Sequence, residues 1–208
     1  MRRLATLVVL FLAVGAGSAR ANAFGQLIPA APLMGGNNLF GVHLLLGDRV
    51  DDVGLLGQVR FSSSPKLDWG LQLGFTDAGD GGVMLGGDIR PILRRQDDEV
   101  PLDLAFDGGL GLTITDNVTV FELVPAIEAS HRFGMDSGGA LSPYLGVGLD
   151  VNISSFDNNG AGDDSDTDVD VVARFGLEWE ISSKFGIQGE FGVGDPANDF
   201  IMGVNVAF

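Results

Sequence analysis

Ionisable side chains recur at alternate positions along this chain, and the arginines among them are few. Arginine forms planar, two-point hydrogen bonds with carboxylates, so these residues on shared faces predict a network of ion pairs. The predicted set is Arg60, Asp68, Asp88, Arg90, Asp103, Asp107, Glu122, Glu128, Arg132, Asp150, Asp170, Arg174, Glu178, Glu180 and Glu190. Its carboxylates outnumber its arginines, so a path that prefers cations is the alternative to a network that only fills space.

An acidic segment at residues 157–168 carries oxygen-bearing side chains at alternating positions, the composition that calcium prefers. The candidate ligands are Asp163, Asp164, Asp166 and Asp168. The spacing is not that of an EF-hand, because the sixth position counted from Asp164 is Val169 rather than glycine. We therefore expect a solvated acidic loop, with specific calcium binding as the alternative.

An enzyme would need a nucleophile or a base within a constructed site. The chain has two histidines. In the barrel predicted below, the alternation places His43 on the face toward the interior and His131 on the face toward lipid. Neither has an obvious serine partner, so we expect no enzymatic activity and no cofactor. A site built from acids alone is left open.

The elements that must position these residues are strands. From about Asn38 onward, segments of roughly nine to fifteen residues alternate apolar with small or polar residues, with no intervening helical period. The ten predicted strands are residues 39–47, 53–62, 67–75, 82–93, 102–115, 119–133, 142–154, 168–181, 184–194 and 199–208. The first two segments alternate less cleanly, so eight or twelve strands remain open.

Strand length distinguishes the two architectures considered for this alternating sequence, a soluble β-sandwich and a transmembrane β-barrel. Strands of soluble sandwiches average about five or six residues, whereas a tilted strand that crosses a membrane needs about nine to eleven. Most segments here reach the longer class. A hydrophobic fraction of 45% combined with 32 glycines and a net charge of −16 also favours a transmembrane barrel. We predict an all-β fold, a transmembrane antiparallel up-and-down β-barrel of about ten strands.

The first 23 residues are typical of a secretory signal peptide. Arg2 and Arg3 precede an apolar stretch over residues 4–14, and residues 21–23 form an A-x-A cleavage site. Residues 24–37 carry two prolines and no alternation, so we expect a lead-in segment, and residues 38–208 form the predicted barrel. Cleavage removes three arginines and no acids, leaving a net charge of −19, which argues against a nucleic-acid partner.

Aromatic residues sort by strand direction into two predicted girdles at the membrane surfaces. One holds Phe61, Trp69, Phe133, Tyr144, Trp179, Phe185 and Phe208, and the other holds Phe75, Phe121, Phe156, Phe191 and Phe200. The connections beyond the second girdle are acidic, and an even-stranded barrel directs such connections outward from the cell.

The segment Gly203-Val204-Asn205-Val206-Ala207-Phe208 resembles the terminal signal of outer-membrane barrels, with Gly203, Val206 and Phe208 as its key positions. Ile201 departs from the polar residue usual two places before the glycine. With its Gly-rich alternating strands, the chain resembles the small OmpA/OmpX-type outer-membrane β-barrel superfamily. The resemblance implies recognition by the outer-membrane barrel assembly machinery, and no narrower family is assigned.

We therefore expect export through a cleaved signal peptide to the outer membrane of a Gram-negative bacterium. The expected function is non-enzymatic, as a structural component or a narrow porin-like conduit for small solutes or cations. The alternatives are a binding or adhesion module that acts through the acidic outer connections, and a surface enzyme. Expected partners are membrane lipid and lipopolysaccharide. The sequence does not predict an oligomeric state. Because fold similarity does not transfer activity, the resemblance does not assign a function.

Overall fold

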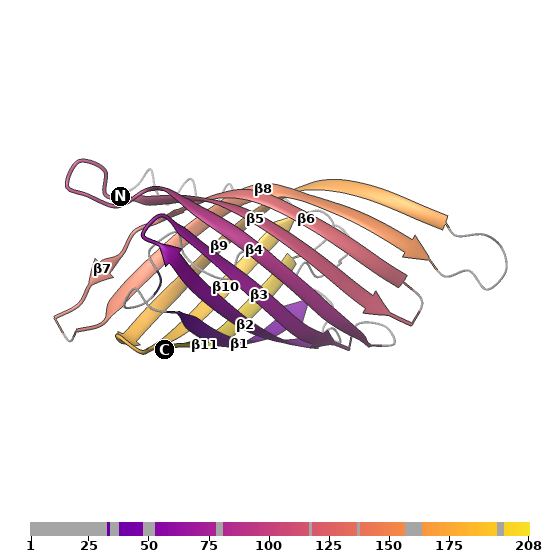
Figure 1. The fold of residues 1–208 in the computed structure, drawn as a ribbon, viewed down its shortest axis with the longest axis horizontal. Helices are drawn as coiled ribbons and strands as arrows, with labels where there is room; N and C mark the ends of the chain where they lie inside the picture. The colour runs from indigo at the N-terminus through magenta and orange to yellow at the C-terminus, as the bar shows by residue number, and fades with distance from the viewer. Residues whose placement is uncertain are drawn as a thin grey trace.

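The computed structural model describes residue 33 and residues 38–47, 53–77, 81–116, 118–136, 138–156, 164–194 and 198–208. Ten strands close into one antiparallel barrel (Figure 1). They are β1 (Leu39–Gly47), β2 (Val53–Ser64), β3 (Leu67–Thr76), β4 (Gly82–Arg94), β5 (Asp103–Thr115), β6 (Val118–Ser130), β8 (Ala140–Phe156), β9 (Asp164–Ser182), β10 (Phe185–Gly194) and β11 (Asn198–Ala207). A two-residue strand, β7 (Phe133–Gly134), lies beside the start of β8.

Neighbours in the barrel are also neighbours in sequence, apart from two pairings. β1 pairs with β11, and β6 pairs with β8, so the sheet has no open end. The predicted all-β, antiparallel up-and-down barrel of ten strands is confirmed, and the eight- and twelve-stranded alternatives are wrong. Closure satisfies the backbone hydrogen bonds that would otherwise be exposed at a sheet edge.

The strands are strongly tilted. A row of paired residues that leaves β9 at Glu180 and passes once around the barrel returns to β9 at Asp168, a displacement of twelve residues. With ordinary strand spacings this stagger corresponds to a tilt of about 40° from the barrel axis. Figure 1 shows the strands crossing the long axis obliquely.

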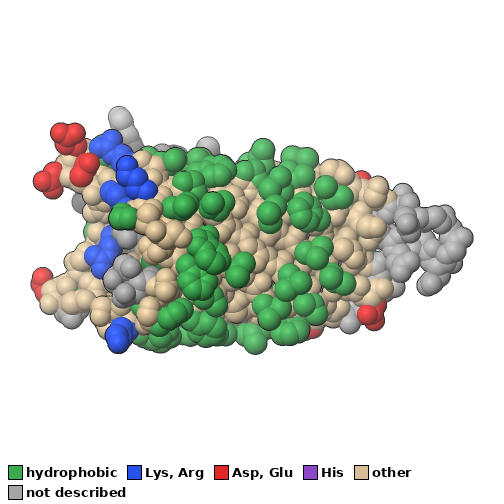
Figure 2. Space-filling view, in the orientation of Figure 1, with side chains coloured by type: hydrophobic (Ala, Val, Ile, Leu, Met, Phe, Trp, Pro, Cys, Tyr) green, Lys and Arg blue, Asp and Glu red, His purple; other side chains and the backbone are tan. Residues whose placement is uncertain are grey.

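Polar side chains point inward and apolar side chains point outward. On β3, Asp68 and Gln72 are buried, whereas Leu71 and Phe75 are 55% and 58% exposed. The same alternation continues on the other long strands, and Figure 2 shows hydrophobic side chains over the flank of the barrel. A flank of this kind favours an apolar surrounding medium. No helix among the described residues is long and apolar enough to cross a membrane.

Most predicted strand limits agree with the structure to within two residues, but the strand predicted over 119–133 is interrupted. The His131 amide donates to the Pro143 carbonyl at 3.2 Å, and the Arg132 amide donates to Gln96 Oε1 at 2.9 Å. The Arg132 amide thus bonds to a side chain of the connection between β4 and β5 instead of to a strand backbone, and β6 ends at Ser130. Residue 131 therefore does not occupy an outward strand position, and His131 Nδ1 instead contacts the Pro101 carbonyl oxygen.

Two further expectations are corrected. β8 and β9 pair without interruption out to Phe156 and Asp164, so residues 164–168 form a strand rather than part of a loop. Tyr144 was predicted in an aromatic girdle, but its position shares the inner face with Ser142, and its side chain is buried inside the barrel. Side-chain direction follows strand parity, which overrides the apolar character of the ring.

The barrel has two ends, here called proximal and distal. The proximal end carries Asn38, Phe208 and the turns at residues 65–66 and 183–184, and the distal end carries residues 77 and 116. Leu33 is buried against Leu39 and Ala207, which lie on inner positions at the proximal end. The rest of the predicted lead-in segment and the predicted signal peptide lie outside the described residues.

Candidate functional site: the charged lumen

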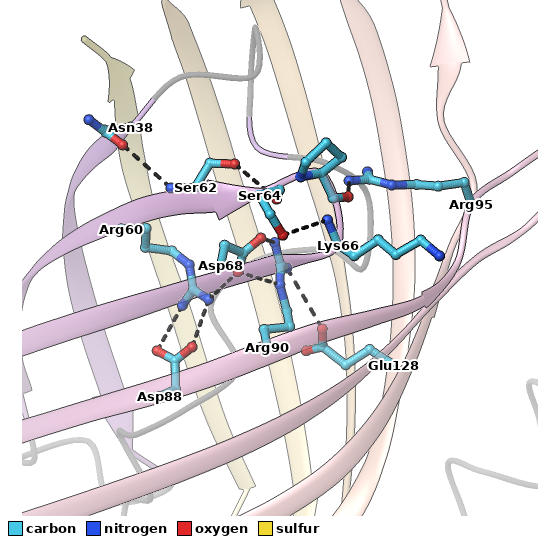
Figure 3. A network of polar contacts seen from close by, with 11 residues as sticks. Asn38, Arg60, Ser62, Ser64, Lys66, Asp68, Asp88, Arg90, Arg95 and Glu128 are labelled. Atoms are coloured by element: carbon cyan, nitrogen blue, oxygen red, sulfur yellow. Dashed lines mark hydrogen bonds and ion pairs between the residues drawn. The ribbon is translucent and has the colours of Figure 1, made fainter.

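The interior of the barrel, here called the lumen, contains a chain of five charged side chains (Figure 3). Arg60 donates to both carboxylate oxygens of Asp88, at 2.8 and 2.6 Å. It also donates to Asp68 Oδ1 at 3.0 Å, and Arg90 holds both oxygens of Asp68 at 2.9 and 2.8 Å. Glu128 completes the chain 3.9 Å from Arg90. We call these five residues the lumen plug; they join β2, β3, β4 and β6.

The plug is possible because a glycine lies beneath it. Gly70 sits opposite both Arg60 and Asp88 in the strand register. A Cβ atom at that position would lie 2.7 Å from Asp88 Oδ1 and 3.0 Å from Arg60 Nη1. A side chain would therefore push the ion pair away from the barrel wall, and glycine allows it to lie flat across the sheet.

A second network crosses the opposite wall. The Tyr144 hydroxyl donates to Glu190 Oε2 at 2.7 Å and accepts from Gln188 at 2.6 Å. Arg174 donates to Glu190 Oε1 at 3.2 Å. Asn205 connects the network to Gln188 at 3.0 Å. The network joins β8, β9, β10 and β11, so buried polar contacts bridge most of the barrel circumference.

A separate ion pair lies at the proximal mouth. Arg132 donates to both oxygens of Glu180, at 3.0 and 2.7 Å. Arg132 was expected on an inward strand position; it lies in the break after β6, and its side chain is 43% exposed. Glu178, also predicted, is buried, and its Oε1 accepts from Asn205 at 3.5 Å.

The remaining predicted carboxylates are distributed along the lumen. Asp103 is buried near the proximal end, where it accepts from the Gln96 amide at 2.9 Å. Asp107, Glu122 and Asp150 are buried, and each has one carboxylate oxygen without a hydrogen-bond partner among the described residues. Asp170 is half-buried on β9, opposite Asp150. The lumen thus holds more carboxylates than its arginines pair with.

The predicted calcium ligands that the structure describes lie on a strand and not in a loop. Asp166 and Asp168 are exposed positions of β9, Asp164 begins that strand, and Asp163 lies outside the described residues. Within the part of the chain that the structure describes, no group of three or more His, Asp or Glu side chains is arranged to hold a metal ion.

Sequence reasoning missed an apolar cluster inside the lumen. Leu45, Leu56, Met84 and Ile201 are buried together from β1, β2, β4 and β11. Two signals mark it in the sequence. Leu44-Leu45-Leu46 places an apolar residue on both faces of a strand, and Ile201 replaces a polar residue in the terminal pattern. The inner face is therefore not polar throughout.

Chemically, the lumen is suited to closing the barrel. Arg60 and Arg90 are 1% and 0% exposed, inside the barrel wall formed by β2, β3 and β4. Each guanidinium is held by carboxylates from other strands, so neither can swing aside without leaving a buried charge uncompensated. His43 is also buried, and its ring lies close over Gly203.

Comparison with known proteins finds distant structural similarity and no sequence match. No protein-family model and no curated protein sequence matches the chain. A designed transmembrane β-barrel is 14% identical, over 87% of this chain and 100% of that chain, with a TM-score of 0.42. A bacterial polysaccharide outer-membrane secretin is 16% identical over 83% and 65% of the two chains, with a TM-score of 0.46. The N-terminal barrel domain of OprF from Pseudomonas aeruginosa is 13% identical over 88% and 99%, with a TM-score of 0.39.

Two of these proteins are described as β-barrels and the third as an outer-membrane secretin, and no family is assigned to this chain from them. At such identities and TM-scores, no activity or partner passes from them to this chain. The fold assignment rests on the strand pairing of the chain itself.

Proposed function

We propose that this protein is a non-enzymatic, integral outer-membrane β-barrel whose lumen is closed to solutes. The membrane placement is supported by the outward apolar face. Leu71, Phe75 and their equivalents on the other strands would expose a continuous apolar flank to water in a soluble protein. Buried in hydrocarbon, each side chain instead contributes about 1.5–3 kcal/mol relative to its exposed state.

The closed lumen is carried by one observation, the lumen plug. Two guanidinium groups with almost no exposed surface lie inside the barrel and connect β2, β3, β4 and β6. Barrels of about eight strands are filled by side chains, whereas open aqueous channels appear at around sixteen. The structural role is therefore that of a rigid membrane anchor that carries the outer connections.

Planar-bilayer recording tests the closed lumen. The wild-type protein should give no stable conductance steps. The double variant Arg60→Ala with Asp88→Ala removes one arginine together with its two-point partner, and should open a path and raise the conductance. The matched control, Arg132→Ala with Glu180→Ala, removes a pair at the exposed mouth and should leave the baseline unchanged. Folding of each variant is checked by heat-dependent migration on a gel. A large, unselective current through the wild type would refute closure.

A second candidate, a narrow cation conduit, is favoured by the carboxylate excess. Asp107, Glu122 and Asp150 keep a carboxylate oxygen without a hydrogen-bond partner in the described structure, and they lie on adjacent strands. A conduit predicts a small cation-selective current that loses its ion preference in Asp88→Asn with Asp107→Asn. Unchanged selectivity would favour the filled lumen instead.

A third candidate is a binding module at the distal end, which is favoured by exposed Asp166 and Asp168 on β9. Asp166→Asn with Asp168→Asn should then abolish capture of a surface partner while the barrel still assembles. We also propose that the terminal strand, with Gly203, Val206 and Phe208, is read by the barrel assembly machinery. An assembly assay with Phe208→Ala tests that role, and an unchanged yield would argue against it.

A further inference from the structure

Strand β9 has an open edge at the distal end of the barrel. On one side, β9 pairs with β8 without interruption out to Asp164, which lies opposite Phe156. On the other side, its pairing with β10 ends at Val172, opposite Gly194. Among the strands that the structure describes, none pairs with that side of β9 over residues 164–171. Figure 1 shows the β8–β9 pair, in orange, extending further than the other strands at this end.

The backbone of this edge presents hydrogen-bonding groups away from β8. Alternate residues of a strand direct their N–H and C=O groups to opposite sides. The Pro143 carbonyl accepts from the His131 amide on the β6 side, so the odd-numbered residues of β8 face β6 and the even-numbered ones face β9. Even-numbered residues of β9 lie opposite even-numbered residues of β8, so they face β8 in turn. The open edge therefore presents the backbone groups of Ser165, Thr167 and Val169.

The side chains beside this edge are acidic on one face and uncharged on the other. Asp166 and Asp168 are exposed on the face that continues the lumen wall, and Asp170 follows on the same face. Asp166 Oδ1 accepts from the Thr167 amide at 2.9 Å, so this edge N–H is held by a side chain of its own strand. On the outer face, Val169 is 60% exposed. An exposed strand edge of this kind is a template for an added strand.

The acids select which strand can be added. If a second copy of β9 paired antiparallel with this edge, odd-numbered residues would lie opposite odd-numbered ones, and aspartates would lie opposite aspartates. Like charges directly opposite each other are destabilising, so self-pairing is disfavoured. A strand with lysine or arginine at every second position instead places a cation opposite each of Asp166, Asp168 and Asp170. Such a cation can also draw the Asp166 carboxylate from the Thr167 amide, which frees that amide for the added strand.

We propose that the open edge of β9 binds an extended basic segment of another protein as an added antiparallel strand. The segment carries lysine or arginine at alternate positions, with threonine or valine between them on the outer face. Backbone hydrogen bonds supply affinity, and the alternating charges supply specificity and register. The inference rests on the proposed binding module at the distal end, and it names the kind of partner that the module takes.

Fluorescence anisotropy with short labelled peptides tests the proposal on the whole protein in detergent micelles. The probe alternates lysine with valine or threonine. One control peptide has the same composition with its lysines in a single block. The other keeps the alternating order but is N-methylated at the residues between the lysines, which removes the backbone donors that would face β9. The alternating probe should bind at least about fivefold more tightly than the N-methylated peptide, because backbone hydrogen bonds are lost.

Protein variants address the same edge from the other side. Val169→Pro removes an edge N–H that β8 does not use, and proline is tolerated on such an edge, so the barrel should fold while affinity falls by at least about fivefold. Val169→Thr keeps the N–H and is the matched control, with affinity unchanged. Asp166→Asn with Asp168→Asn should weaken binding by about two- to thirtyfold, as loss of two exposed cross-strand ion pairs does.

The outcomes separate this inference from the binding module on which it rests. Equal affinity for the alternating and N-methylated peptides, or full affinity in Val169→Pro, would overturn strand addition. If Asp166→Asn with Asp168→Asn still lowers binding in that case, a module that recognises charge alone survives. Absence of binding by every peptide overturns the inference as well. A dimer in sedimentation that Val169→Pro dissolves would assign the edge to a second copy and overturn the basic partner.

Discussion

A methyl group at position 176 should destabilise the barrel from inside. Gly176 on β9 lies opposite Tyr144 on β8, and the tyrosine ring lies flat over the glycine. A Cβ atom there would be 2.1 Å from Tyr144 Cζ and 2.3 Å from its hydroxyl oxygen. Favourable carbon contacts lie at about 3.5–4.0 Å, so the ring of Gly176→Ala has to move by more than about 1 Å.

The size of the destabilisation follows from the hydrogen bonds that the Tyr144 hydroxyl makes. This hydroxyl bonds to Glu190 at 2.7 Å and to Gln188 at 2.6 Å, and neither bond survives such a displacement intact. Overpacking costs about 1–3 kcal/mol, and loss of a hydrogen bond to a charged group costs about 1.5–3 kcal/mol. The free energy of unfolding of Gly176→Ala should therefore fall by about 3–5 kcal/mol.

The assay is urea unfolding in lipid vesicles, followed by tryptophan fluorescence. Gly189→Ala on the neighbouring strand is the matched control, because no atom lies within 4 Å of its added Cβ. It should leave stability unchanged or slightly raised. Adding Tyr144→Ala to Gly176→Ala removes the clash, so the two substitutions should be strongly non-additive. If Gly176→Ala unfolds at the same urea concentration as Gly189→Ala, the packing argument is wrong.

Three further outcomes are expected. Asp88→Asn breaks the two-point bond to Arg60 and should lower the free energy of unfolding by about 3–5 kcal/mol in the same urea assay. Asp107→Asn should be neutral or stabilising, because it removes a buried negative charge. Equal losses of stability in the two variants would contradict the assigned pairing. Arg132→Gln leaves Glu180, whose side chain is 5% exposed, without its ion-pair partner, and should cost more than the about 0.2–1 kcal/mol of an exposed pair but less than Asp88→Asn. A loss as large as that of Asp88→Asn would place Arg132 in the closed interior. Calorimetry at millimolar Ca²⁺ should show no heat of binding. A signal that disappears in Asp166→Asn with Asp168→Asn would instead restore the calcium hypothesis.

The sequence by itself determined the strands and their faces. Alternation has a period of two, which is a local property, so Asp103, Asp107 and Glu122 can be assigned to one face without knowing any partner. Strand length then selected a membrane barrel over a sandwich. The predictions failed where a distant residue competes for the backbone, as Gln96 does at Arg132, and where strand parity places an aromatic ring inside, as for Tyr144.

Only the tertiary structure decided which charges meet. Asp88 and Asp107 look alike in the sequence, yet Asp88 binds Arg60 through both oxygens, whereas Asp107 is buried with an oxygen lacking a hydrogen-bond partner among the described residues. The Arg60–Asp88 pair depends on the register of β2, β3 and β4, which sets both residues opposite Gly70, because a one-residue slip would move every side chain of a strand to the opposite face. Closure and stagger belong to the whole sheet, so no single strand encodes them.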